Sequence, residues 1–116
     1  MTVKRVVTNI ATQDIAAARA FYGNILGMEI VMDHGWIATY ASGEAMTAQI
    51  SFASEGRSGT PVPDISIEVD NLDEVFGKVQ AAGFGIEYGP AVEPWGVRRF
   101  FVRDPFGRLV NILSHC

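Results

Sequence analysis

The sequence contains a single cysteine, Cys116, among its 116 residues. A lone cysteine forms no internal disulfide and supplies no cysteine cluster for a metal ion. We therefore expect the fold to depend on burial of apolar side chains, which make up 48% of the chain. That proportion, at this length, is typical of one globular domain spanning residues 1–116.

Positive charge is also scarce, because nine Lys and Arg residues stand against thirteen Asp and Glu residues, giving a net charge of -4. Proteins that bind nucleic acid neutralise phosphates with an excess of basic residues, so we expect no nucleic-acid partner. Charged residues of both signs make up only 19% of the chain. This share lies below the usual value of about 25%, so more apolar side chains than a small monomer can bury should lie at the surface. We therefore expect a second copy of the chain to cover them in a homodimer.

Long apolar runs are absent as well. No stretch approaches the roughly 18 apolar residues that mark a transmembrane helix. The first five residues lead directly into strand-like sequence and lack the apolar core of a signal peptide. We therefore expect a cytoplasmic protein with no membrane partner.

Two stretches of the chain share one plan, in which a strand runs into a helix that has a capping residue at its head. The first stretch passes from Asn9 to Asp14, and the second passes from Ser66 to Asn71. Side-chain oxygens of Asp and Asn accept hydrogen bonds from the amides of a first helical turn. The sequence therefore predicts helices that begin at Asp14 and Asn71.

Apolar residues spaced three or four apart support both helices. In the helix predicted over 14–22, with its stripe extending to residue 25, they are Ile15, Ala18, Tyr22 and Ile25. In the helix predicted over 71–82 they are Leu72, Val75, Phe76 and Val79. Gly27 and Gly83 follow the two helices, where a left-handed helix end favours a residue without a side chain.

After each helix the apolar residues alternate, as is typical of strands. The expected strands cover residues 28–32, 35–40, 46–52, 64–69, 85–88, 97–103 and 108–114. A polar stretch rich in Gly and Pro, about 55–63, separates the two halves. We predict an α+β domain of two tandem βαβββ modules, about 1–54 and 64–116, forming a curved mixed sheet with helices outside.

Several segments carry a resemblance to a known family. They are the paired modules, the helix ending in Phe21-Tyr22, the stretch from Ile65 to Asp73, and the closing run from Phe100 to Gly107 with its Asp-Pro-Phe-Gly turn. Their order and spacing resemble the glyoxalase/bleomycin-resistance/extradiol-dioxygenase superfamily, also called vicinal oxygen chelate proteins. The resemblance covers nearly the whole chain.

The resemblance implies that metalloenzymes of this superfamily hold a divalent metal with histidines and glutamates from the strands that open and close each module. The matching positions here are Val7 and Asp64 for the opening strands, and Gln49 and Asn111 for the closing strands. Zinc, iron and nickel need imidazole, thiolate or several carboxylates. We therefore expect no metal and no cofactor, with a weak all-oxygen site through Gln49, Asp64 and Asn111 as the alternative.

Strand alternation predicts a polar sheet face and, beneath the helices, an apolar face. We expect the polar face to bind a small organic molecule, since amides, a carboxylate and aromatic rings can orient and stack one. This resembles the metal-free, antibiotic-sequestering branch of the superfamily, in which a dimer traps a drug. The candidate binding residues are Val7, Asn9, Trp36, Tyr40, Gln49, Asp64, Trp95, Arg98 and Asn111.

Other interpretations stay open for these residues. Trp36 and Tyr40 can instead pack a dimer interface, Asp64 can be a polar strand end, and Arg98 can be a solvated surface charge. We expect no catalytic residue, because no nucleophile motif is present in the sequence. An enzyme of the same superfamily, a lyase, isomerase or dioxygenase that uses Asp64 as a base or recruits a metal, is the alternative. A scaffold dimer without a ligand is a third hypothesis.

Overall fold

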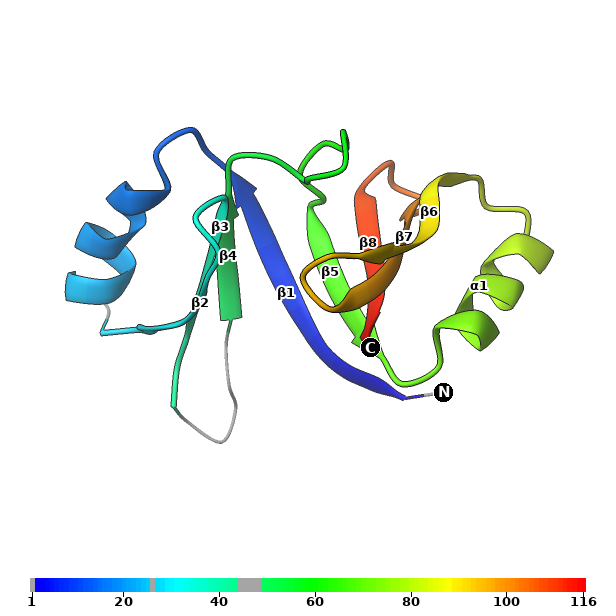
Figure 1. Cartoon of the computed structure of the whole chain (residues 1–116), viewed down its shortest axis with the longest axis horizontal. Coiled ribbons are helices and arrows are strands. Elements are labelled where there is room, and N and C mark those ends of the chain that lie inside the picture. The colour runs from blue at the N-terminus through cyan, green and yellow to red at the C-terminus, as the bar shows by residue number, and fades with distance from the viewer. Residues whose placement is uncertain (1, 26, 44–48) are drawn as a thin grey trace. The chain divides into compact units, whose positions relative to one another are not determined.

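The computed structural model describes residues 2–25, 27–43 and 49–116 (Figure 1). The chain divides into two compact units. Unit 1 comprises Met1–Val6 with Pro63–Cys116, and unit 2 comprises Val7–Val62. Strand β1 (Val3–Ala11) contributes residues to both units. Among the described residues, no helix has the length and apolar character that crossing a membrane requires.

In unit 2 the strands follow the order β2-β3-β4-β1. They are β2 (Glu29–Asp33), β3 (Ile37–Ala41), β4 (Gln49–Ala53) and the second part of β1. β1 runs parallel to β4, whereas β3 is antiparallel to both β2 and β4. The predicted strand over 46–52 is confirmed from Gln49 onward, and residues 46–48 lie outside the described residues.

Unit 1 has the same plan of a strand, a helix and three strands. Its elements are β5 (Ile65–Val69), α1 (Leu72–Ala81), β6 (Ile86–Glu93), β7 (Val97–Arg103) and β8 (Leu109–His115). β5 runs parallel to β8, and β7 is antiparallel to both β6 and β8. The mixture of parallel and antiparallel pairs, with a helical segment in each unit, confirms the predicted α+β class and the repeated βαβββ order.

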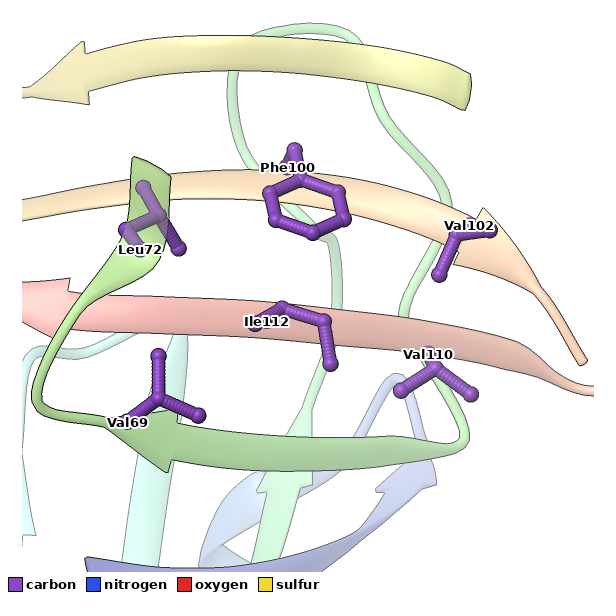
Figure 2. Packing of buried hydrophobic residues seen from close by; sticks show 6 residues of the cluster. All are labelled: Val69, Leu72, Phe100, Val102, Val110 and Ile112. Carbon is purple, nitrogen blue, oxygen red and sulfur yellow. The ribbon is translucent and has the colours of Figure 1, made fainter. Parts of the chain in front are cut away.

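Helix α1 begins and packs as the sequence predicts. The side chain of Asn71 accepts a hydrogen bond from the amide of Glu74 at 3.2 Å, which satisfies a free first-turn donor. The apolar side of α1 covers one face of the unit 1 sheet (Figure 1). Figure 2 shows the buried cluster beneath it, which consists of Val69, Leu72, Phe100, Val102, Val110 and Ile112. Each such side chain contributes roughly 1.5–3 kcal/mol on burial.

The helix predicted over 14–22 is helical but is not an α-helix. A 3₁₀ turn, η1 (Ile15–Ala17), precedes a π-helical segment, η2 (Arg19–Ile25). The predicted cap is present, because Oδ1 of Asp14 accepts a hydrogen bond from the amide of Ala17 at 3.3 Å. Of the predicted apolar stripe, Ala18 belongs to a buried cluster with Ala38, Tyr40 and Phe52, and Ile15 and Tyr22 pack against it. The side chain of Ile25 lies outside the described part of the structure.

The strand predicted over 85–88 was too short, since β6 extends to Glu93. Gly89 and Pro90 indicate a strand end in the sequence, but the structure accommodates them in a register shift between Tyr88 and Ala91. A bulge of this kind lets a strand continue past residues that interrupt regular pairing. β6 consequently reaches the Pro94–Gly96 turn and pairs with most of β7.

Gly89 offers a test of this bulge. Its φ is +80°, and an added Cβ would lie 2.5 Å from the carbonyl oxygen of Arg99, so Gly89→Ala should lower the free energy of unfolding by about 2–3 kcal/mol. Gly77→Ala is the control, because nothing lies within 4 Å of its added Cβ and alanine favours helices by about 1 kcal/mol. Urea denaturation would measure both, and equal stabilities of the two variants would contradict the prediction.

Candidate functional site

The face of the unit 1 sheet opposite α1 carries a row of four side chains, one from each strand. In the observed register, Ser66 of β5 pairs with Asn111 of β8, Asn111 with Phe101 of β7, and Phe101 with Tyr88 of β6. Because neighbouring side chains alternate along a strand, Val110 and Ile112 in the cluster beneath α1 direct Asn111 to the other face. We call Ser66, Asn111, Phe101 and Tyr88 the Asn111 row.

Asn111 is buried, with 7% of its surface exposed. Its side-chain amide donates from Nδ2 to Oγ of Ser66 at 3.2 Å. Its Oδ1 accepts no hydrogen bond from any residue that the structure describes. Leaving a buried acceptor unsatisfied costs about 1–3 kcal/mol, so native proteins rarely do so without a partner from outside the chain. Asn111 is therefore the strongest single indication of a binding site.

A second group of side chains lies beside this row and centres on Arg99, which is 3% exposed. Its guanidinium lies 4.8 Å from the ring centre of Phe101, 4.9 Å from that of Trp95 and 5.4 Å from that of Tyr88. Oε1 of Glu93 is 3.7 Å from Nε of Arg99 and accepts a hydrogen bond from the Tyr88 hydroxyl. We call these five residues the Arg99 cluster.

The charge of Arg99 is balanced inside the chain. Burial lowers the pKa of Arg99 below its ordinary value, and the neighbouring Glu93 carboxylate and Tyr88 oppose this shift. Arginine stays protonated at neutral pH even when its pKa is somewhat reduced. Arg99 and Glu93 therefore form a buried ion pair without net charge, with aromatic rings around the guanidinium.

Glu68 is a further acidic group on this side of unit 1. Oε1 is 2.8 Å from Nε of Arg5, and Oε2 is 3.2 Å from Nδ1 of His115. Burial raises the pKa of Glu68, but the hydrogen bonds and charges of His115 and Arg5 together outweigh it, so the pKa lies below the ordinary value of 4.5. This contact joins the beginning of β1 to β5 and β8.

Unit 2 has an equivalent row on its sheet. Asn9 pairs with Ser51, and Ser51 pairs with Thr39, whose hydroxyl lies 2.7 Å from that of Ser51. Asn9 of β1 thus corresponds to Ser66 of β5, and Ser51 of β4 corresponds to Asn111 of β8. The amide side chain lies on the first strand of the pair in unit 2 and on the last strand in unit 1. Val7 is buried, and Gln49 is half-buried. By strand alternation both face the same side as Asn9 and Ser51.

Two of the predicted binding residues lie on the helix side of their sheets instead. Tyr40 pairs with Ile50 and packs in the cluster with Ala18 and Phe52, because its strand position is one residue out of phase with Thr39. Arg98 forms an ion pair with Asp73 of α1, at 2.7 Å. Both were candidates for ligand binding, but the structure places Tyr40 in an apolar cluster and Arg98 beside α1, away from the Asn111 row.

Three further predicted residues, Asp64, Trp36 and Trp95, lie outside the Asn111 row. Oδ2 of Asp64 accepts a hydrogen bond from the amide of Leu109 at 3.0 Å, so this carboxylate closes the end of the β5–β8 pair. Asn111 is in register with Ser66 and not with Asp64. Trp36 is half-buried, and the Arg57 guanidinium lies 5.3 Å from its ring centre. Trp95 belongs to the Arg99 cluster.

These positions do not fit a transition-metal site. Across residues 2–25, 27–43 and 49–116, no group of three or more His, Cys, Asp and Glu side chains can hold a metal ion. Val7 has no donor atom, the Asp64 carboxylate binds a backbone amide, and Asn111 supplies a neutral amide. Neutral amides are poor substitutes for the imidazole and thiolate ligands that zinc or iron requires.

Arg99, Phe101, Tyr88 and Glu93 were not among the sequence-based candidates. The sequence could have indicated Arg99 and Phe101, because the strand predicted over 97–103 has the observed bounds of β7. Alternation along that strand places both residues on the face opposite Phe100. Tyr88 and Glu93 depended on the length of β6, which the Gly-Pro pair obscured.

Comparisons with known proteins agree with this architecture. The family model described as "Glyoxalase/Bleomycin resistance protein/Dioxygenase superfamily" matches residues 4–112. No curated protein matches the chain significantly.

Solved structures of the same fold include three that match nearly the whole length of this chain. A Streptomyces coelicolor methylmalonyl-CoA epimerase is 16% identical, with a TM-score of 0.75 and 99% of each chain covered. A superfamily member from Vibrio splendidus is 15% identical, with a TM-score of 0.67, covering 99% of this chain and 100% of that one. A Legionella pneumophila structure named as an NAD-dependent benzaldehyde dehydrogenase is 14% identical, with a TM-score of 0.77 and coverages of 97% and 100%. Identities this low support a shared fold alone.

Glu93→Gln tests the buried ion pair. Removing the carboxylate leaves the Arg99 charge buried without its partner, so the free energy of unfolding should fall by about 3 kcal/mol. In the double variant Glu93→Gln/Arg99→Met the unpaired charge is also gone, so part of this loss should be recovered. Glu87→Gln is the matched control, because the Glu87–Arg103 pair is 2.7 Å long but exposed and should contribute less than about 1 kcal/mol. Strictly additive losses in a urea double-mutant cycle would contradict the pairing.

Glu68→Gln tests the acid dependence of stability. Because the folded pKa of Glu68 lies below its ordinary value, its ionised form stabilises the fold above that ordinary value, and this contribution is lost as the pH falls through the folded pKa. The stability advantage of the wild type over Glu68→Gln should therefore shrink between about pH 6 and pH 3. Urea denaturation across this range measures it, with Glu29→Gln on the exposed edge of β2 as the control. An advantage that is constant with pH would refute the prediction.

Proposed function

The chain belongs to the glyoxalase/bleomycin resistance protein/dioxygenase superfamily, and on that premise we propose that it binds a small organic molecule without a metal ion. The observation that carries this proposal is the buried Oδ1 of Asn111, which accepts no hydrogen bond from any described residue. The resemblance implies that this closing-strand position is one of those at which the superfamily's metalloenzymes carry a metal-binding histidine or glutamate. An amide there retains a directed acceptor for a ligand but lacks the charge that a transition metal favours.

The charged groups around Asn111 also support binding more than proton transfer. Glu93 is paired with Arg99, Glu68 with Arg5 and His115, and Asp64 accepts the amide of Leu109. A general base must reach a substrate proton with a free lone pair at a suitable pKa. The carboxylates near the Asn111 row are instead used in structural contacts.

The methylmalonyl-CoA epimerase and the dehydrogenase among the similar structures keep an enzyme of this superfamily as the second candidate. Such an activity would need a metal or a base beyond the groups described above.

We further propose that the protein is cytoplasmic and forms a homodimer. A dimer is also the form in which the drug-sequestering branch that the sequence resembles traps its drug. Large apolar side chains at the surface, Val92 at 71% exposed and Phe106 at 86%, are compatible with association.

Metal content and ligand binding test this function together. Protein purified without chelators should contain far less than one transition-metal ion per chain, by elemental mass spectrometry. Ligand-observed NMR with a library of small aromatic compounds should reveal binders whose signals are lost with Asn111→Ala and kept with Gln80→Ala on the exposed side of α1. The melting temperature of Asn111→Ala should change by only a few degrees, since the amide is incompletely satisfied.

A stoichiometric iron, zinc, nickel or manganese ion would overturn the metal-free proposal in favour of an enzyme. Binders that are unaffected by Asn111→Ala would place the site elsewhere. Loss of binding together with a collapse of the melting temperature would assign Asn111 a structural role.

A further inference from the structure

Resting on this proposed function, we propose that the ligand is an uncharged molecule that donates an N–H or O–H hydrogen bond to Oδ1 of Asn111 and places a planar apolar group beside Phe101. Three features of the described residues support this ligand class. They are the orientation of the Asn111 amide, the pairing of the neighbouring charges, and the aromatic character of the row.

The orientation of Asn111 determines the polarity of its partner. Nδ2 is engaged with Ser66 at 3.2 Å, and Oδ1 is the buried atom without a hydrogen bond from a described residue. An amide oxygen accepts hydrogen bonds and cannot donate them. A ligand carbonyl or carboxylate at this place would put two acceptors together, whereas a hydroxyl or an N–H would satisfy Oδ1.

The balance of charge around Asn111 disfavours an ionic ligand. Arg99 and Glu93 neutralise each other with Nε and Oε1 3.7 Å apart, and both are buried. Glu68 has cationic or hydrogen-bonding partners in Arg5 and His115. Burying a ligand ion without an opposite charge is expensive. A neutral donor pays no such desolvation penalty, because one hydrogen bond to Asn111 replaces the one it loses to water.

The neighbours of Asn111 determine the apolar part of the ligand. Phe101 is directly across from Asn111 in the β7–β8 register, and side chains so paired have Cβ atoms about 5 Å apart. The Tyr88 and Phe101 rings meet edge to face, with centres 5.5 Å apart. Leu113 follows Asn111 on the same face of β8. A group that reaches Oδ1 therefore meets aromatic and aliphatic surface, which suits phenols, primary amides on rings and N–H heteroaromatics.

Matched pairs of small probes test the donor requirement. Phenol and benzamide carry the donor, anisole and N,N-dimethylbenzamide carry the same ring with the donor methylated, and benzoate carries a charge. Titrations of ¹⁵N-labelled full-length protein, followed by ¹H–¹⁵N spectra, should show phenol and benzamide binding about tenfold more tightly than their methylated partners. The side-chain NH₂ signal of Asn111 should shift with the donors. Benzoate should bind most weakly.

Variants at one position separate the hydrogen bond from the packing. Asn111→Leu should abolish the preference for donors, so that phenol and anisole bind equally, while its ¹H–¹⁵N spectrum stays dispersed. Asn111→Asp keeps an acceptor oxygen and adds charge, so it should retain phenol binding and gain affinity for benzylammonium. Ser66→Ala removes the partner of Nδ2 and leaves Oδ1 in place, so it should preserve the preference for donors.

The outcomes distinguish this inference from the proposed function. Equal binding of donors and methylated probes, tighter binding of benzoate, or no binding by any probe at millimolar concentration would overturn the donor class. The proposed function would still stand in each case if the library yields binders that depend on Asn111 and the purified protein lacks a metal. A stoichiometric transition metal would end both.

Discussion

The candidate site depends on the register of β8 between β5 and β7. Val110 and Ile112 are buried beneath α1, and the alternation of side chains along a strand then forces Asn111 onto the opposite face. The same hydrogen-bonded ladder places Ser66 on one side of Asn111 and Phe101 on the other. A shift by a single residue would expose the apolar cluster and bury different polar groups, so core packing and site geometry are set by one constraint.

Burial of charge is the second feature that shapes the face. Arg99 is buried together with Glu93 and is surrounded by the rings of Tyr88, Trp95 and Phe101. A buried ion pair is weak evidence for stability, because desolvation offsets most of the attraction. Its consequence here is electrostatic neutrality, and Oδ1 of Asn111 is a buried acceptor on this face that receives no hydrogen bond from a described residue.

The internal repeat explains how a family scaffold carries a different site. In unit 2, the buried hydroxyl of Ser51 finds its partner in Thr39 within the chain. In unit 1, the corresponding position is Asn111, and the residue across from it is Phe101, which offers no hydrogen bond. The two rows are equivalent in topology, but only the row in unit 1 leaves a buried acceptor among the described residues unsatisfied.

The sequence by itself determined the α+β class, the repeated βαβββ order and α1 with its Asn71 cap, because periodicity and capping are local properties. Tertiary structure alone decided the rest. It turned Tyr40 and Arg98 toward the helices, used Asp64 to close a strand end, and assembled the Arg99 cluster from β6, β7 and their turn. Cross-strand register joins residues far apart in sequence, and no periodicity within a single strand specifies it.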